Sequence, residues 1–267
     1  MAYVEYRYVF RDSIEYEYRF CGHYGQRGER RSPRTRPSTE QMKRQNQWSR
    51  QKYLRRKVKL NFEEGDPLIT LKYKAGARPP LDEVEKDFKR FRDRIRRELK
   101  KRGLPFKYIY RMEIGKRGSP HIHLLMNYTE DILKLIRKCW EPGQANIEAT
   151  YDLENGELAD YLSKPPDEEI EARLEELPEG ERKKFVRFSC SRNLENPEPE
   201  KRIYSHRTVA KKIRDGIEPT PGYYIDKESV RYGVNTFSGY SYLYYTEIRG
   251  DCAGAKIVPV WKEEPPW

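Results

Sequence analysis

The sequence has few cysteines and histidines, four of each among 267 residues, and no long apolar run. The cysteines are scattered without a C-x-x-C pair, and the lone C-x-H at 21–23 is too small a set for a zinc site. We therefore expect a reduced, intracellular protein. No stretch approaches about 18 uninterrupted apolar residues, which excludes a membrane-spanning helix. The N-terminal MAYVEYRYVFRD alternates aromatic with polar residues and lacks the apolar segment of a signal peptide.

Other signals are also missing. No G-x-x-x-x-G-K-[ST] sequence occurs, so the chain has no P-loop nucleotide site of its own. There is no internal repeat. Aromatic residues make up 13% of the chain, with 21 tyrosines, and this content argues against wholesale disorder. The length allows a full core, as one large domain or as one domain with an extension.

Positive charge is concentrated in one segment. Residues 27–59 contain thirteen Lys or Arg and two Glu, a surplus equal to the net charge of +11 of the whole chain. Such a segment is often only a solvated face. With aromatic residues among the cations, it also suits contact with the backbone and bases of single-stranded DNA, which we favour. The residues expected to contact DNA are Arg30, Arg31, Arg34, Arg36, Lys43, Arg44, Trp48, Arg50, Lys52, Arg55, Arg56 and Lys57.

The element order predicts an α+β fold. Alternating residues at 4–10 and 14–20 predict a β-hairpin, and a basic helix is expected from Ser38 to about Leu60. Further strands are expected at 65–74, 106–114, 121–128 and 144–151, with helices at 82–102 and at 129–140, where Thr129 is the expected N-cap. This β-α-β-β-α-β order is typical of ferredoxin-like folds, whose helices cover one face of an antiparallel sheet and leave the other open.

Three segments are expected. They are the N-terminal hairpin and basic DNA-binding segment at 1–64, the core at 65–166, and a C-terminal part at 167–267. The C-terminal part should hold a charged helical insertion at 167–185, a basic helix at 201–216 and a tyrosine-rich, strand-like end that packs on the core. The tyrosine-rich end either completes a core with the N-terminal hairpin or forms a surface for a partner.

The sequence H-I-H at 121–123 lies in an expected strand. Because side chains alternate along a strand, His121 and His123 share one face. The preceding strand ends at Glu113, which a hairpin turn of seven residues places roughly opposite His121. Two imidazoles and a carboxylate are ligands that hold a divalent ion and leave positions open. The alternative is a pair of histidines that pack in a sheet without a metal.

A short helix at 156–164 carries Tyr161 and Lys164. These residues lie three apart and so share a helix face. A tyrosine attacks phosphorus when its proton leaves and its oxyanion is steered, which a nearby cation and a metal-polarised phosphate favour. The short helix follows the last strand of the βαββαβ unit, where it can pack beside the open face.

Three motifs in order resemble those of the HUH endonucleases. They are ITLKY at 69–73, E-x7-H-I-H at 113–123 and YLSK at 161–164. This superfamily includes rolling-circle replication initiators, relaxases and transposases that share a histidine-hydrophobic-histidine metal site. The chain is most similar to the replication-associated proteins of bacterial plasmids and filamentous-type phages. The resemblance covers about residues 20–205, and FSCSRNLENP at 188–197 adds to it.

The resemblance implies a function and a role for each residue. His121, His123 and Glu113 would bind Mg²⁺ or Mn²⁺, Tyr161 would be the nucleophile and Lys164 its electrostatic partner. The enzyme would nick one strand at a replication origin, leaving a 5′-phosphotyrosine and a free 3′-OH, and would later seal a circle. It would act in the cytoplasm of a bacterial host, and strand opening would come from supercoiling or a host helicase. Tyr151 is the alternative nucleophile.

Other classes remain open. A cyclic phosphodiesterase needs two H-x-T/S motifs, and this chain has one, at 206–208. A non-enzymatic module that binds single-stranded nucleic acid usually sets aromatic residues on its central strands, where this chain has His-x-His; a metal requirement separates the two. Within the superfamily, a transposase or a relaxase remains an alternative.

Overall fold

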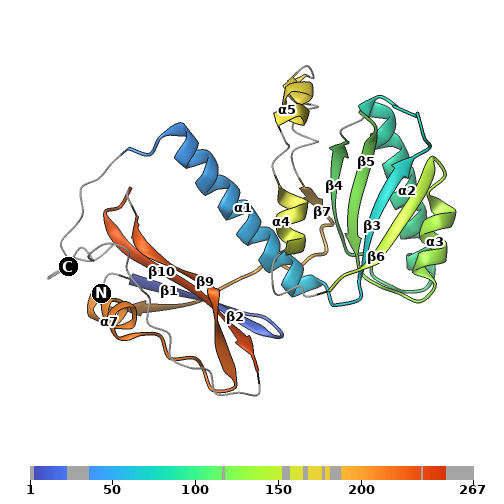
Figure 1. Cartoon of the computed structure of the whole chain (residues 1–267). Helices are drawn as coiled ribbons and strands as arrows, with labels where there is room; N and C mark the ends of the chain where they lie inside the picture. Colours follow the sequence, from blue (N-terminus) through green and yellow to red (C-terminus); the bar gives the residue numbers. More distant parts are fainter. Residues whose placement is uncertain are drawn as a thin grey trace. The chain divides into compact units, whose positions relative to one another are not determined.

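The computed structural model describes residues 3–22, 36–115, 118–151, 157–164, 168–175, 178–180, 188–235 and 237–250 (Figure 1). The chain divides into two compact units, one of residues 1–48 with 197–267 and the other of residues 49–196. Each unit is built on a five-stranded antiparallel sheet, which confirms the α+β class. No helix in the described ranges combines the length and the hydropathy needed to span a membrane.

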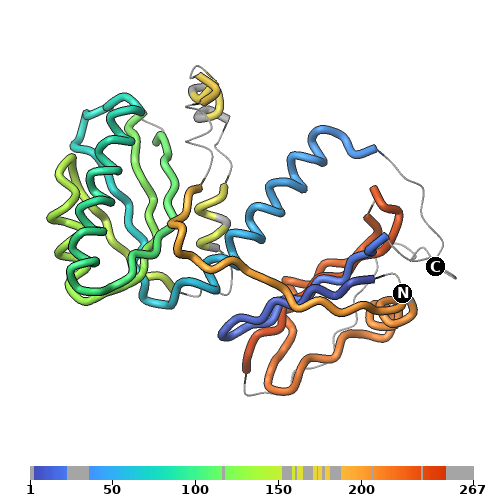
Figure 2. Tube along the Cα trace, turned by 180° about the vertical axis from the view of Figure 1, so that it is seen from behind, coloured from blue at the N-terminus to red at the C-terminus, as the bar shows by residue number. Residues whose placement is uncertain are grey.

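The 49–196 unit contains the βαββαβ order predicted from the sequence. Its sheet has the strand order β6-β3-β5-β4-β7. The strands are β3 (Pro67–Tyr73), β4 (Tyr108–Ile114), β5 (Pro120–Met126), β6 (Gly143–Ala149) and β7 (Phe188–Cys190). The helices α2 (Leu81–Lys101) and α3 (Ile132–Cys139) lie together on one face of this sheet (Figure 2). The edge strand β7 was not predicted.

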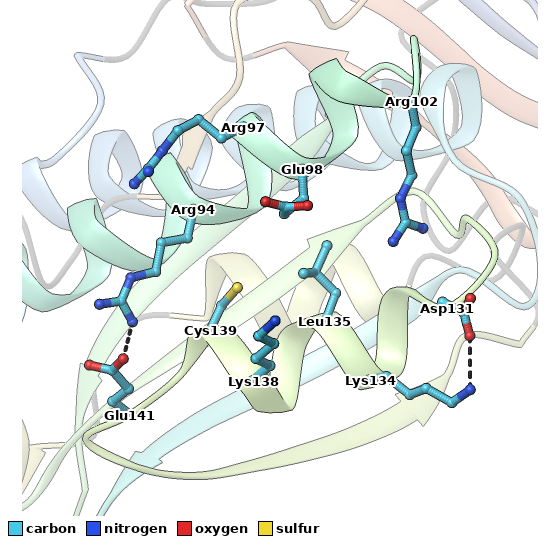
Figure 3. Close-up of a pocket in the computed structure, with 10 residues that line it drawn as sticks. All are labelled: Arg94, Arg97, Glu98, Arg102, Asp131, Lys134, Leu135, Lys138, Cys139 and Glu141. Carbon is cyan, nitrogen blue, oxygen red and sulfur yellow. Dashed lines mark hydrogen bonds and ion pairs between the residues drawn. The ribbon is translucent and has the colours of Figure 1, made fainter.

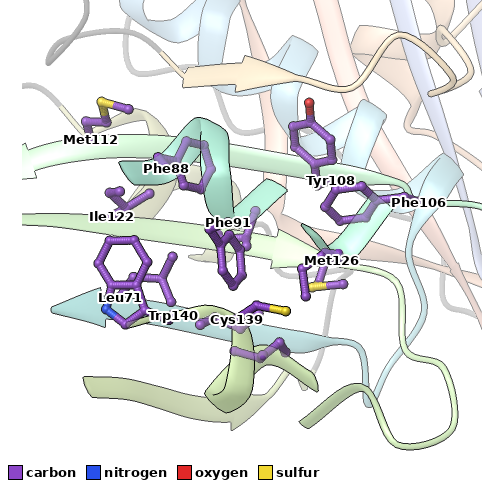
Figure 4. Packing of buried hydrophobic residues seen from close by; sticks show 14 of the residues in the cluster. Leu71, Phe88, Phe91, Phe106, Tyr108, Met112, Ile122, Met126, Cys139 and Trp140 are labelled. Atoms are coloured by element: carbon purple, nitrogen blue, oxygen red, sulfur yellow. The ribbon is translucent and has the colours of Figure 1, made fainter. Parts of the chain in front are cut away.

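The apolar stripe of α2 makes the main core. Val84, Phe88, Phe91, Ile95 and Leu99 recur every three or four residues, so they share one helix face, and all are buried (Figure 4). They pack with α3 against every second residue of the central strands. As expected, α2 ends before Gly103, whose φ of +70° favours glycine.

The opposite face of the sheet is only partly open, which corrects the expectation from the sequence. The end of α1 (Thr39–Asn61) and the short helix α4 (Glu157–Ser163) cover one part of it. Leu54 and Val58 of α1 and Leu162 of α4 form a second cluster with Ile109 and Leu125. This cluster holds α4, and therefore Tyr161, beside the uncovered part of the face.

The start of β6 requires a glycine. A Cβ on Gly143 would lie 2.1 Å from the carbonyl oxygen of Lys72 on β3. We expect Gly143→Ala to lower the free energy of unfolding by about 3 kcal/mol, because only backbone movement relieves the clash. Urea denaturation measures this, with Gly180→Ala as control, since nothing lies within 4 Å of a Cβ there. Equal midpoints for the two variants would contradict the close approach.

The other unit joins the two ends of the chain. Its sheet has the order β8-β1-β2-β10-β9, so the N-terminal hairpin pairs with the tyrosine-rich hairpin through β2 and β10. The strands are β1 (Tyr3–Val9), β2 (Ser13–Phe20), β8 (Glu200–Tyr204), β9 (Tyr223–Asn235) and β10 (Tyr240–Arg249). The unit boundaries therefore differ from the three expected segments: the tyrosine-rich end completes a sheet with the hairpin instead of packing on the 65–166 core.

The expected helix at 201–216 is half strand. Residues 200–204 form β8, and only α7 (His206–Asp215) is helical. Ser205 begins the helix, because its Oγ accepts a hydrogen bond from the backbone N–H of Thr208. Val209 and Ile213 of α7 pack on the buried face of the sheet. Within the charged insertion, α5 (Glu168–Glu175) is helical, and much of the rest lies outside the described residues.

Candidate metal and nucleophile site

Strand register brings five polar side chains to one face of the sheet. On the pair β4–β5, Glu113 lies opposite His121 and Arg111 opposite His123. On the pair β3–β5, Thr70 lies opposite His123. Since directly opposed residues of an antiparallel pair point to the same face, all five share the face away from α2 and α3. The register of Glu113 against His121 is the one that the sequence predicted.

Glu113 holds the two histidines. Its Oε2 lies 3.0 Å from Nε2 of His123 and 3.3 Å from Nε2 of His121. Candidate ligand atoms of the three residues all lie within 4.8 Å of one another. His123 is buried, with 4% of its surface exposed, while the other two are partly exposed. The cluster is therefore enclosed on the side of the sheet and open toward solvent.

The charge of Glu113 is stabilised where it lies. Burial by itself would raise its pKa, but hydrogen bonds from His121 and His123 and the charge of Arg111 outweigh burial and hold the pKa well below its usual range. Glu113 is thus a carboxylate at neutral pH. Its Oε2 converges with two imidazole nitrogens, and this donor set fits a divalent cation.

Thr70 orients the buried histidine. Its Oγ1 lies 3.3 Å from Nδ1 of His123. A ligating imidazole usually binds metal through one nitrogen and donates the N–H of the other to an oxygen, which fixes the ring. With Nε2 toward Glu113, Nδ1 of His123 is the nitrogen that Thr70 orients. Thr70 stands in the ITLKY motif, and sequence analysis gave it no role.

The hydroxyl of Tyr161 lies at this cluster. Its Oη is 3.0 Å from Nδ1 and 3.1 Å from Nε2 of His123, and the two rings meet edge to face with centroids 4.9 Å apart. The residue is 46% exposed, so a substrate can reach it. Burial and the charge of Glu113 raise the pKa of Tyr161, whereas the charge of Arg111 lowers it. The structure therefore brings together Glu113, His121, His123 and Tyr161 as predicted.

Arg111 is the residue of this site that sequence analysis missed. It is 1% exposed, and its Nη2 lies 3.1 Å from Oε1 of Glu113. Its Nη1 donates to the backbone carbonyl oxygens of Leu162 and Lys164 at the end of α4. Burial lowers the pKa of Arg111, but a guanidinium remains charged at neutral pH. One buried cation thus links the carboxylate of the cluster to the helix that carries Tyr161. A charged residue two positions from Glu113 in an apolar strand is the signal that could have indicated it.

The other two predicted catalytic candidates are placed differently. Lys164 is exposed, and its backbone carbonyl accepts a hydrogen bond from Arg111. The cation that the structure places at Tyr161 is Arg111. Tyr151 is 81% exposed and follows the end of β6 that pairs with Pro67, whereas His121 pairs with Lys72 near the other end of β3. Tyr151 therefore lies away from the cluster.

The predicted DNA contacts have mixed positions. Arg30, Arg31 and Arg34 lie outside the described residues. Arg36, Lys43, Arg44 and Arg50 are exposed, and Trp48, Lys52 and Arg55 are partly exposed. Arg56 and Lys57 are buried, which corrects their expected place on a DNA-facing surface. Nζ of Lys57 donates to Oδ1 of Asn196 at 3.1 Å, so this cation fixes a loop.

A hollow of about 490 Å³ lies between α2 and α3 (Figure 3). It is lined by side chains of both charges, and two of its cations are paired: Arg94 with Glu141, and Lys134 with Asp131. It belongs to the helical layer, on the other side of the sheet from the histidines. These mutually compensated charges give it no evident chemistry, and its residues serve below as controls.

One comparison with known proteins gives a match. A family model described as a replication-associated protein, of the ORF2 type, matches residues 66–166. Over that segment the chain is similar to replication-associated proteins. The segment contains β3 to α4, and with them the whole cluster and Tyr161. No curated protein and no solved structure matches the chain.

Proposed function

We propose that the chain is a rolling-circle replication initiator of the HUH type, which nicks and rejoins one DNA strand at an origin through a 5′-phosphotyrosine. The observation that carries this proposal is the position of the Tyr161 hydroxyl, 3.0 Å from His123 in a cluster with Glu113 and His121. The match of the surrounding segment to replication-associated proteins supports the biological role.

The residues have separate tasks in this chemistry. A divalent ion held by Glu113, His121 and His123 would polarise the scissile phosphate as a Lewis acid. The oxygen of Tyr161 attacks phosphorus as its proton leaves, and the charge of Arg111 favours the phenolate. The P–O3′ bond breaks as the P–O bond to tyrosine forms, and the leaving oxygen becomes a free 3′-OH. Because the phosphotyrosine is itself a phosphodiester, a 3′-OH can reverse the step and seal the strand.

A covalent adduct tests this proposal. Overlapping single-stranded oligonucleotides from the replicon that encodes the chain are mixed with the protein and Mn²⁺, or with EDTA, and run on a denaturing gel. We expect a metal-dependent shifted band whose tryptic phosphopeptide contains Tyr161. A phosphopeptide containing Tyr151 would move the nucleophile. DNA binding without an adduct on any fragment would leave a non-enzymatic binding module and overturn the proposal.

Arg111 is expected to act as a positioning residue. Arg111→Met removes the clamp between Glu113 and the end of α4, so we expect adduct formation to slow by about 10- to 100-fold, the cost of a small misplacement of the nucleophile. Affinity for single-stranded DNA should be unchanged, a split that a general loss of folding would not give. Arg97→Met in the α2–α3 hollow is the control, and equal rates for the two variants would contradict the role of Arg111.

A further inference from the structure

A second groove lies in the unit of residues 1–48 and 197–267. It has a volume of about 670 Å³ and runs between the first half of α1 and the hairpin of β9 and β10. This volume is within the range of ligand sites, about 300–1,000 Å³. None of the groove's residues belongs to the segment that matches replication-associated proteins, so a function here would be separate from the Tyr161 site.

One wall of the groove is aromatic. The rings of Trp48 and Tyr244 lie with centroids 5.4 Å apart, and those of Tyr242 and Tyr244 lie 5.2 Å apart. Gly233 leaves room for this arrangement, because a Cβ there would lie 3.1 Å from Oη of Tyr242. At the tip of the hairpin, Phe237 also lines the groove and is 72% exposed.

The hairpin turn fixes the backbone at Phe237. Oδ1 of Asn235 accepts hydrogen bonds from the backbone N–H groups of Phe237 and Ser238, both at 3.0 Å. The carbonyl of Asn235 accepts a third from the N–H of Gly239 at 2.7 Å. A large apolar side chain is thus presented to solvent by a hydrogen-bonded turn, next to three further aromatic rings. Such a surface suits a flat, stacking ligand.

The other wall is polar and lacks acids. α1 contributes the amides of Gln41, Gln45 and Asn46, and β9 contributes Arg231. Among the described residues that line the groove, none is Asp or Glu, although these make up 43 residues of the chain. Exposed Lys43 and Arg44 stand on the same part of α1. The groove is therefore electrostatically suited to an anionic ligand.

We infer that this groove binds unpaired nucleotides of a single DNA strand. Bases stack on aromatic rings, Asn and Gln amides pair with base edges, and arginine meets phosphate. A purely apolar peptide would offer the amides no hydrogen bonds, and an acidic peptide would not use four aromatic rings. Five arginines at 27–36 immediately precede Pro37, which lines the groove. The inference rests on the proposed function only in taking DNA as the substrate.

Binding in EDTA tests the groove apart from any strand cleavage. The probe is a fluorescein-labelled oligo(dT) of about 15 nucleotides, followed by anisotropy with the full chain. We expect Phe237→Ala to weaken binding about 5- to 100-fold, the range of one lost base stack, with an unchanged salt dependence because no charge is removed. Phe237→Tyr should restore affinity. Tyr128→Ala is the control, since Tyr128 is an exposed aromatic residue of the other unit.

Crosslinking locates the DNA directly. An oligonucleotide with 5-iodouracil is irradiated with the protein, and the crosslinked peptide should contain Trp48, Phe237, Tyr242 or Tyr244. Wild-type affinity in Phe237→Ala, crosslinks confined to residues 49–196, or equal competition by duplex DNA would each overturn the inference. Groove crosslinks without a Tyr161 adduct would retain this inference and reject the proposed nicking. An adduct without groove crosslinks would do the opposite.

Discussion

Tyr161→Phe is expected to abolish the covalent protein–DNA band, lowering cleavage by at least about a thousandfold, since removal of a catalytic nucleophile costs this much or more. The variant keeps the ring that packs edge to face on His123 and loses only the oxygen that lies 3.0 Å from Nδ1 of that residue. α4 should stay in place, because Leu162 and Ala159 hold it to the sheet. The rate of adduct formation at saturating Mn²⁺ measures the effect.

The matched control is Tyr151→Phe, which removes a hydroxyl from an exposed tyrosine away from the cluster. We expect this variant to form adduct at the wild-type rate. Both variants should bind single-stranded DNA as tightly as wild type, so that any loss concerns chemistry. A full adduct yield in Tyr161→Phe would assign the nucleophile to another residue and refute the role given to Tyr161.

The local part of the site could be predicted because its geometry depends on strand periodicity. Alternation puts His121 and His123 on one face, and the apolar residues between and after them fix which face is buried. The hairpin then sets Glu113 opposite His121. No contact between distant segments is needed for these three residues, so sequence alone was sufficient to group them.

Arg111 and Thr70 could not be predicted in the same way. Arg111 acts through carbonyl oxygens about 50 residues later in the chain, at the end of α4. Backbone carbonyls leave no trace in a residue pattern, so only the folded position of α4 makes this contact visible. Thr70 reaches His123 through the pairing of β3 with β5, whose register depends on the whole sheet.

Helix ends show how local signals succeed and fail. Ser38 begins α1 as predicted: Gln41 N–H donates to Oγ of Ser38, and Ser38 N–H donates to Oε1 of Gln41, a reciprocal cap. Thr129 was expected to begin α3, but the helix starts at Ile132. The preceding Asp131 has a left-handed backbone with φ of 59° and is the N-cap position instead. A conformation of this kind is set by the loop and not by residue preference.

The second sheet depended on pairing that no local pattern encodes. β8 is an edge strand with exposed side chains at 200–203, so it lacks the alternation that identifies half-buried strands. The pairing of β2 with β10 joins residues more than 220 positions apart in sequence. Tyrosine-rich alternation predicted strands at both ends of the chain, but not that the strands would share a sheet.

Removal of the two histidines is the second large effect expected. His121→Ala/His123→Ala leaves Glu113 as the only member of the cluster, so we expect adduct formation to fall on the order of a thousandfold, since Lewis-acid stabilisation is worth several kcal/mol. Wild type in EDTA should show the same loss, and Mn²⁺ should restore wild type but not the variant. The dependence of the rate on Mn²⁺ concentration measures this.

A readout other than activity separates a metal site from a structural pair of histidines. A metal that binds only the folded chain stabilises it by about 2.7 kcal/mol at 100 times its dissociation constant. Mn²⁺ should therefore raise the melting temperature of wild type and leave that of His121→Ala/His123→Ala unchanged. Lys134→Ala/Lys138→Ala, in the α2–α3 hollow, controls for changes away from the cluster and should keep the full shift. If the histidine variant kept it too, the ion would bind elsewhere and the two histidines would serve to pack Glu113 in the sheet.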